Sequence, residues 1–331
     1  MQRLALAFLA LTFALAACGG AVSPTLIVDL PSATPGALRH VRLPMGFIPS
    51  VQYAPFYVAV DKGYFAQEGL EVEFDYSFET NGVQLVGANQ LPFAVVSGEQ
   101  VLLARAQGLP VVYVMAWFQK FPVAVIAKAD SGIKAPGDLK GKKIGTPTLD
   151  GANFVGLRAL LAHAGIQAEE VTVDAIGFNQ VPALTAGQVE AVVVYANNEP
   201  IRLSAQGEQF NVIPVGDYVA LAANGLLSNE TVVAQEPELA RGFVRALAHG
   251  IQDTLANPDE AYAISKKFVE TLTDDELEKK VLAATMAMWK TSRVGYADPQ
   301  AWENMQIALL EAKLLNEKQD LSRAFTNEFI P

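Results

Sequence analysis

Cysteine, histidine and positive charge are all scarce in this chain of 331 residues. The single cysteine excludes a disulfide framework and any zinc site built from several thiolates. The 24 lysines and arginines stand against 35 aspartates and glutamates, so the net charge is −11. A nucleic-acid binder needs a cationic face that displaces phosphate counterions, and this charge balance argues against one.

Signatures of catalysis are missing as well. The chain contains no G-x-S-x-G, H-E-x-x-H, Walker or G-x-G-x-x-G motif. None of its three histidines lies in a loop that we expect to face a cleft. We therefore predict that the protein is not an enzyme and that it holds neither a metal nor a cofactor.

Apolar residues make up 51% of the chain and charged residues only 18%. Such a chain can bury enough surface to offset the entropy lost on folding, which excludes a disordered protein. Its length suggests about two domains. The mean hydropathy of +0.23 raises the question of a membrane. However, no segment after the N-terminal region reaches about 18 residues without charges or turn residues.

The N-terminus has the pattern of a bacterial export signal. Arg3 precedes an uncharged run from Leu4 to Leu15, and about 12 residues are too few to span a bilayer but suit a signal peptide. The tetrapeptide Leu15–Cys18 resembles a lipobox, in which the signal is cut before a cysteine that then receives a diacylglyceryl group. An ordinary secretory signal with an incidental cysteine is the alternative.

These features predict a signal peptide over 1–17, lipidation at Cys18 and a flexible tether over 18–40, which is rich in Gly, Ser, Pro, Thr and Ala. We expect a protein that is anchored by lipid alone to the extracytoplasmic side of the cell membrane.

Short apolar runs alternate with helical stretches from Val41 onward, which predicts an α/β fold with helices on the faces of its sheets. One such series covers about 41–122, and a second covers about 129–215. The pattern after Leu221 is mostly helical. Among the helices that we expect are 54–67, 81–88, 237–256, 258–271, 274–289 and 299–315.

Three motifs resemble the family that contains the alkanesulfonate-binding proteins and the thiamine-pyrimidine binders. The opening segment 46–70 includes the sequence KGYFAQEGL, 138–145 matches the turn that opens the second lobe in that family, and 186–191 matches a step before a lobe-two strand. The resemblance covers about 41–260. Each motif alone is weak, but together they are specific.

The resemblance implies a two-lobed clam shell of the type II periplasmic-binding-protein class with a helical C-terminal part. Lobe 1 would comprise 41–122 and 219–331, and lobe 2 would comprise 123–218. Two crossing strands, near 122–128 and 216–224, would form the hinge, and a small-molecule ligand would bind between the lobes. The expected partners are the permease and ATPase of an ABC importer, with the binding protein a monomer. A sensor lipoprotein without transport remains an alternative.

The loops that would face the cleft contain many aromatic and amide side chains and almost no cations, apart from Lys120. This inventory suits a neutral, planar heterocycle with polar edges better than an anion, although helix N-termini alone can bind anions. The sharpest local feature is Tyr195–Glu199, where polar residues directly follow a buried strand. The residues that we expect to bind ligand are Gln52, Tyr53, Asn81, Ser97, Glu99, Trp117, Phe118, Asp150, Asn153, Tyr195, Asn198 and Glu199.

Purely structural roles are the alternative for several of these residues. Many of the aromatic residues would pack in the hydrophobic core. Glu99 would be an acidic side chain that the helix dipole stabilises at a helix N-terminus. In the thiamine-pyrimidine binders an aromatic and an acidic residue contact the ring, and Tyr195 and Glu199 match them.

The segment 97–122 resembles the riboflavin-binding branch of these lipoproteins, so riboflavin is the expected transported ligand. Alternatives are a hydroxymethyl- or formylamino-pyrimidine, then an alkanesulfonate. A pyrimidine-synthase-like enzyme is disfavoured, because the cysteine-rich motif of those relatives is absent here.

Overall fold

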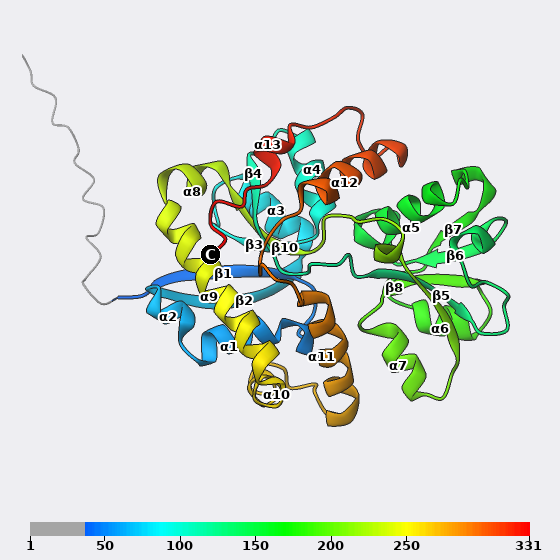
Figure 1. Cartoon of the computed structure of the whole chain (residues 1–331), viewed down its shortest axis with the longest axis horizontal. Coiled ribbons are helices and arrows are strands. Elements are labelled where there is room, and N and C mark those ends of the chain that lie inside the picture. Colours follow the sequence, from blue (N-terminus) through cyan, green and yellow to red (C-terminus); the bar gives the residue numbers. More distant parts are fainter. Residues whose placement is uncertain (1–36) are drawn as a thin grey trace, which may run out of the picture. The chain divides into compact units, whose positions relative to one another are not determined.

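The computed structural model describes residues 37–331, and the predicted signal peptide, Cys18 and nearly all of the predicted tether lie outside them. From Leu38 to Pro331 the chain forms one compact unit. Within it, two lobes lie side by side, with residues 123–214 forming the sheet of the second lobe (Figure 1). The exact boundaries of the lobes, between 122 and 123 and between 218 and 219, stay a prediction.

The first lobe contains two small sheets. One pairs β1 (Arg39–Gly46) with β2 (Leu70–Phe78) in parallel, and Val41, Leu43 and Met45 of β1 are buried. The other is antiparallel, with β10 (Gly225–Asn229) between β3 (Ala94–Val96) and β4 (Val111–Ala116). The helices of this part are α1 (Ala54–Asp61), α2 (Tyr64–Gln67), α3 (Glu79–Gly87) and α4 (Gly98–Ala106).

The second lobe is built on one five-stranded sheet in the order β7-β6-β8-β5-β9. Its strands are β5 (Val123–Lys128), β6 (Lys143–Thr146), β7 (Thr172–Ala175), β8 (Ala191–Tyr195) and β9 (Phe210–Pro214). Val125 and Val193 belong to the core that includes α5 (Gly151–His163), whereas Ile126 and Val192 pack with α6 (Gln180–Thr185) and α7 (Glu199–Ala205). Burial on both faces explains why β5 and β8 are continuous apolar runs.

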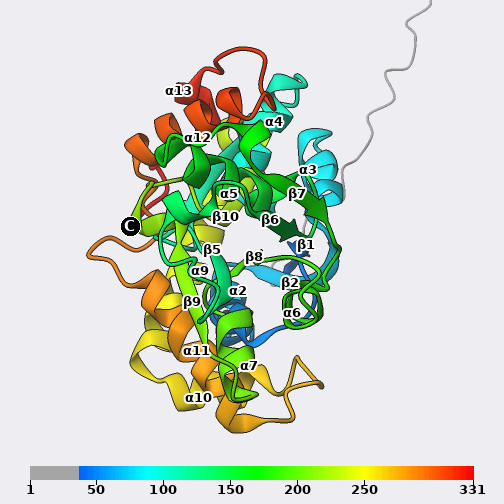
Figure 2. The ribbon, with the colours of Figure 1, turned by 90° about the vertical axis from the view of Figure 1, so that its right-hand side faces the viewer.

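Helices dominate after β10. They are α8 (Glu230–Gln235), α9 (Pro237–Ala256), α10 (Pro258–Ser265), α11 (Asp275–Trp289), α12 (Pro299–Glu311) and α13 (Leu321–Ala324). A Cβ added at Gly250 of α9 would lie 2.2 Å from the carbonyl oxygen of Pro55 in α1, so only glycine permits this approach. Seen from the second lobe, α12 lies beside α5 and α11 beside α7 (Figure 2), and both pairs are in contact.

Two chain segments cross between the lobes. The backbone N–H groups of Trp117 and Phe118 both donate to the carbonyl oxygen of Asn224, at 3.0 and 2.9 Å, and so tie the crossings together. The prediction of two crossing strands was wrong. Residues 216–224 form no strand, and the predicted strand 122–128 is β5, which lies inside the second sheet between β8 and β9.

Several predicted helix limits were also wrong. The helix predicted over 54–67 breaks at Gly63, whose φ of +72° is left-handed and suits glycine. The helices predicted to reach 271 and 315 end at Ser265 and Glu311. Strand β10 was not predicted, because its short apolar run stands directly before the helical region.

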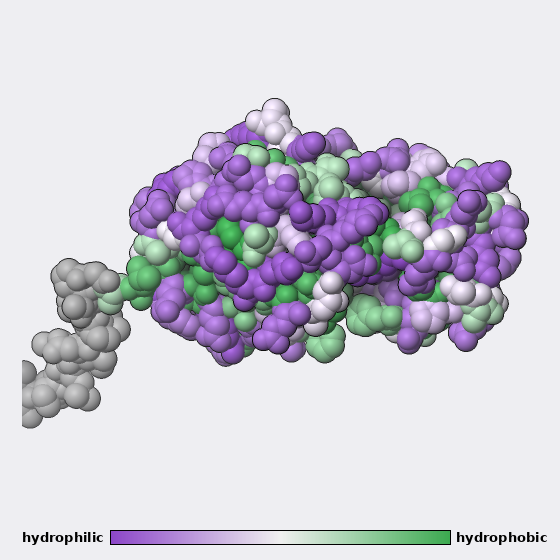
Figure 3. All heavy atoms as spheres, turned by 90° about the horizontal axis from the view of Figure 1, so that it is seen from below, coloured by the Kyte–Doolittle hydropathy of each residue, from purple (hydrophilic) through white to green (hydrophobic). Residues whose placement is uncertain are grey.

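The face in Figure 3 is covered mostly by hydrophilic side chains, with smaller apolar patches between them. Among residues 37–331, no helix combines the length and the apolar character that crossing a membrane requires.

Candidate functional site

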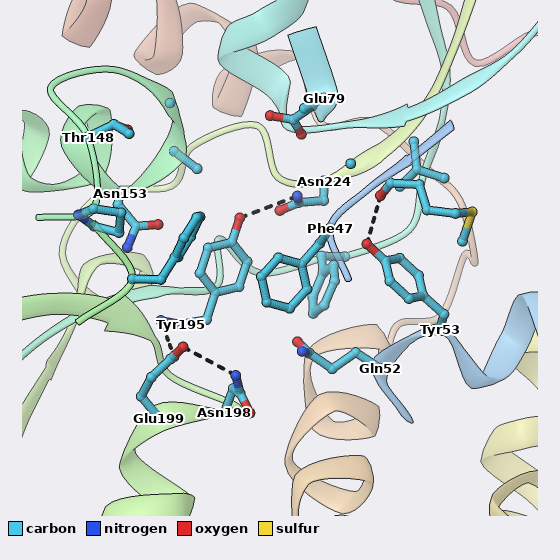
Figure 4. A pocket seen from close by; sticks show the side chains of 18 of the residues that line it. Phe47, Gln52, Tyr53, Glu79, Thr148, Asn153, Tyr195, Asn198, Glu199 and Asn224 are labelled. Carbon is cyan, nitrogen blue, oxygen red and sulfur yellow. Dashed lines mark hydrogen bonds between the residues drawn. The ribbon is translucent and has the colours of Figure 1, made fainter. Parts of the chain in front are cut away.

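A pocket lies between the lobes and takes its walls from loops at the ends of strands, as expected for ligand sites in open α/β folds. Its volume is about 190 Å³, more than ten times the roughly 15 Å³ that a single water needs. This is room for a small organic molecule. Figure 4 shows side chains from both lobes converging on it.

Most of the predicted ligand-binding residues line this pocket. They are Gln52, Tyr53, Trp117, Phe118, Asp150, Asn153, Tyr195, Asn198 and Glu199. Three others do not. Asn81 is exposed on α3, and Ser97 and Glu99 are buried behind the pocket wall.

The misplacement of Asn81 follows from where α3 begins. We predicted a start at residue 81, but the helix starts at Glu79. Residues two positions apart on a helix point about 200° from each other. Glu79 lines the pocket, and Asn81 therefore points away from it.

The set of expected ligand-binding residues left out four polar residues of the pocket wall, Glu79, Thr148, Gln180 and Asn224. An available signal for Glu79 was its place directly after β2, at the start of a helix, where an acid is favoured. Asn224 gave no signal of its own, because the segment before β10 has no regular pattern.

The aromatic residues divide into packed and open ones. Trp117 is 4% exposed and stacks on Tyr53 with ring centroids 5.1 Å apart, and the Tyr53 hydroxyl donates to the carbonyl oxygen of Met45. By contrast, Phe178 is 68% exposed although it lines the pocket. It lies across from Phe47 of the first lobe, with centroids 6.4 Å apart.

The segment Tyr195–Glu199 carries much of the second-lobe wall. Glu199 opens α7, and its carboxylate accepts from the backbone N–H of Tyr195 at 2.9 Å and from Asn198 at 3.2 Å. Burial raises the pKa of Glu199. Arg202 donates to Asn198 and pairs with Glu278 of α11 at 2.9 Å. The hydrogen-bond network therefore holds Asn198 and Glu199 in place from behind.

Asn197 in the same segment has a different role. It is fully buried and donates to Gln52 at 2.6 Å and to Thr285 of α11 at 2.8 Å. It thus joins the two lobes rather than lining the pocket.

A pair of glutamates lies at the first-lobe side. Glu79 accepts from the backbone N–H of Ser97 and lies 2.8 Å from the Ser97 hydroxyl, which also contacts Glu99. Gly98 permits this arrangement, because an added Cβ would lie 2.5 Å from the carbonyl oxygen of Ala222. Burial raises the pKa of both carboxyl groups, and the nearby Glu99 raises that of Glu79 further.

Charge in the pocket is one-sided. Among residues 37–331, its lining includes Glu79, Asp150 and Glu199 but no lysine, arginine or histidine. An anionic ligand would have to rely on backbone N–H groups against these carboxylates. No cluster of three or more His, Cys, Asp or Glu side chains with metal-binding geometry occurs within the described part of the chain.

Comparisons with known proteins agree with this architecture. The NMT1/THI5-like family matches residues 50–261. Riboflavin-binding protein RibY of Chloroflexus aurantiacus is 42% identical over 326 residues, which cover 94% of this chain and 93% of that protein. A formylaminopyrimidine-binding protein of Halalkalibacterium halodurans is 29% identical over 83% of this chain and 86% of its own length. Pyrimidine phosphate synthases also match, at 26% identity or less.

The fold has a clear counterpart among solved structures. The periplasmic aliphatic sulphonate-binding protein of Escherichia coli aligns with a TM-score of 0.71 at 14% identity, covering 86% of this chain and 91% of the other. The predicted fold class is confirmed. The two relatives at 42% and 29% identity are both named as binding proteins, in agreement with the prediction of a non-enzyme. The chain belongs to the NMT1/THI5-like family and has the two-lobed fold of periplasmic binding proteins.

Proposed function

We propose that this chain is the extracytoplasmic solute-binding lipoprotein of an ABC importer and that its ligand is riboflavin. The observation that carries the ligand assignment is the 42% identity to a riboflavin-binding protein over 94% of the chain. The chemistry of the pocket supports it independently.

A flavin has a broad planar ring system with one apolar edge and one uracil-like edge. The open ring of Phe178 and the ring of Phe47 offer aromatic faces for stacking. Asn198 and Glu199 offer donors and acceptors for the polar edge of the ring. The pocket residues Gln52, Tyr53, Trp117, Phe118, Asp150, Asn153 and Tyr195 complete the proposed site.

A pyrimidine ligand is the second candidate, favoured by the 29% identity to a formylaminopyrimidine-binding protein. A single small ring would leave much of the aromatic surface uncovered. An alkanesulfonate fits less well, because no cationic side chain lines the pocket.

Titration of riboflavin fluorescence with the purified full chain tests the assignment. We expect quenching that saturates at one ligand per protein at micromolar concentration or below. Absence of quenching, together with calorimetric binding of formylaminopyrimidine, would move the assignment to the second candidate. Mass spectrometry of ligand retained through purification provides an independent check.

The lipid anchor is a separate part of the proposal. Wild-type protein should sediment with membranes and show the mass of a diacylglyceryl adduct at Cys18. The Cys18→Ser variant should lose both. A wild-type protein that stays in the soluble fraction would contradict the anchor, and neighbouring permease and ATPase genes would support the importer role.

A further inference from the structure

The glutamate pair at the first-lobe side must hold a proton. The Ser97 hydroxyl lies 2.8 Å from Glu79 and is also within hydrogen-bond distance of Glu99. A hydroxyl has one hydrogen, so it donates to only one of these oxygens. The other contact is a hydrogen bond only if that carboxyl group is protonated and donates to Ser97.

The environment of the pair agrees with a shared proton. Glu99 is fully buried, and its second oxygen has no hydrogen-bond partner. Burial raises the pKa of both groups. Because the two groups interact, the proton belongs to the pair rather than to either residue. That proton is used in the contact with Ser97, so Glu79 presents its remaining acceptor lone pairs to the pocket.

A second observation points to a ligand here. Asn224 lines the pocket and is 9% exposed, yet its carbonyl oxygen Oδ1 has no partner. Buried polar atoms normally have partners, so an unpaired one in a pocket wall indicates a group that a ligand supplies. In Figure 4 the carboxyl group of Glu79 points into the pocket toward Asn224.

We propose that Glu79 and Asn224 form a subsite for the hydroxyl-bearing chain of the ligand, with Glu99 supporting Glu79 from behind the pocket wall, and that this subsite selects against a phosphorylated chain. For riboflavin the chain is the ribityl group, so the assignment rests on the proposed function. A hydroxyl group can donate to the remaining lone pairs of Glu79 and to the unpaired oxygen of Asn224. A phosphate would bring negative charge against Glu79 and the nearby Asp150, with no cation in the lining to offset it.

Figure 4 gives this subsite a definite place. Glu79 and Glu199 lie on opposite sides of the Phe47 and Tyr195 rings in that view. A ligand whose ring lies near Tyr195 and Glu199 would therefore direct its chain toward Glu79. The two ends of the pocket would recognise different parts of one molecule.

Three flavins separate the contributions of the ring, the hydroxyl-bearing chain and the phosphate to binding. Riboflavin has the full chain, lumiflavin has the same ring with a methyl group instead, and flavin mononucleotide has a phosphate on the chain. We expect wild-type protein to bind riboflavin at least about tenfold more tightly than lumiflavin, which loses a hydrogen bond to a charged group. We expect a similar preference over flavin mononucleotide, because its phosphate would lie against Glu79 and Asp150. The Glu79→Ala variant should lose about tenfold in riboflavin affinity while its lumiflavin affinity stays within twofold of wild type.

Additional variants make the test sharper. Glu79→Gln should narrow the gap between riboflavin and flavin mononucleotide, because it removes charge and keeps shape. Asn224→Ala should reduce the preference for riboflavin over lumiflavin without changing the charge. Glu71→Gln, on the exposed face of β2, is the matched control and should change none of the affinities.

The outcomes are distinguishable. Equal wild-type affinities for riboflavin and lumiflavin would overturn the subsite and leave the riboflavin function standing. Equal losses for both flavins in Glu79→Ala and Asn224→Ala would also overturn it, since both residues would then act on the ring or on the shape of the pocket. If no flavin binds but an aminopyrimidine does, and Glu79→Gln abolishes that binding, both the subsite and the proposed function fail.

Discussion

The two sides of the pocket differ in which groups lack contacts in the ligand-free protein. On the first-lobe side the rings of Tyr53 and Trp117 are packed against each other, whereas Asn224 and, behind the wall, Glu99 each retain an unpaired oxygen. On the second-lobe side the carboxylate of Glu199 is held by hydrogen bonds, whereas the ring of Phe178 is 68% exposed. One side has oxygen atoms without hydrogen-bond partners, and the other has an aromatic ring that is largely uncovered.

This difference indicates the shape of the ligand. A molecule that pairs with the free oxygens and covers the exposed ring has a flat ring at one end and hydrogen-bonding groups at the other. The difference between the two sides also separates the residues that stabilise the fold from those that bind ligand, even where both line the pocket. The following variants test that separation, from the largest expected effect to the smallest.

Trp117→Ala should lower the free energy of unfolding by about 3 kcal/mol, because it removes a large ring from a tightly packed place. Urea denaturation without ligand measures this. Ligand affinity at low temperature, where the variant is still folded, should change much less than stability does. A variant that keeps its stability and loses binding would show that Trp117 belongs with the ligand contacts.

Phe178→Ala should weaken riboflavin binding by about 1.5 kcal/mol, roughly tenfold, since an exposed aromatic ring gains most when a ligand covers it. Its free energy of unfolding should stay within about 0.5 kcal/mol of wild type, as for other exposed positions. Fluorescence titration and urea denaturation on the same preparation give both values. Unchanged affinity would remove Phe178 from the site.

Glu99→Gln should stabilise the ligand-free protein at high pH. Burial raises the pKa values of Glu79 and Glu99 in the folded state, and the charge of Glu99 raises that of Glu79 further. The folded state then holds protons that the unfolded chain releases near pH 4.3, so stability falls as pH rises from there through the raised values. The variant removes one of these groups.

We expect Glu99→Gln to raise the free energy of unfolding by about 1 kcal/mol at pH 8 and to have little effect near pH 4. Urea denaturation at both pH values measures it, with Glu71→Gln as the control. A variant that is destabilised equally at both pH values would show that the pair is not strained by charge.

Glu199→Gln should have the smallest effect, below about 0.5 kcal/mol in stability. The amide oxygen of glutamine can still accept from the backbone N–H of Tyr195, and Asn198, which loses its acceptor, is only partly buried. A large loss in thermal or urea denaturation would mean that the negative charge of Glu199, rather than its acceptor geometry, holds this segment.

Much of the fold could be predicted because the strands carry strong local patterns. Strand β5 lies where a strand was predicted near 122–128, and α9 begins and ends as predicted. Strand β10 was missed because an antiparallel strand of five residues gains its stability from β3 and β4, which lie far away in the sequence. Local patterns do not contain such pairing.

The same distinction explains the site. Tyr195, Asn198 and Glu199 were found because polar residues directly after a buried strand have no use in packing. Trp117 was also expected to bind ligand because it follows a buried strand, but only the structure shows that Tyr53 stacks on it. Glu79 and Asn224 reach the pocket through the start of α3 and through the crossing segment, and neither position follows from spacing along the chain.

A crystal structure of the full chain with riboflavin tests the central claim most directly. We predict that the isoalloxazine ring lies against Phe178 and that the ribityl hydroxyls lie within hydrogen-bond distance of Glu79 and Asn224. A flavin bound in the reverse direction, or a pocket that remains free of flavin at saturating concentration, would contradict this account.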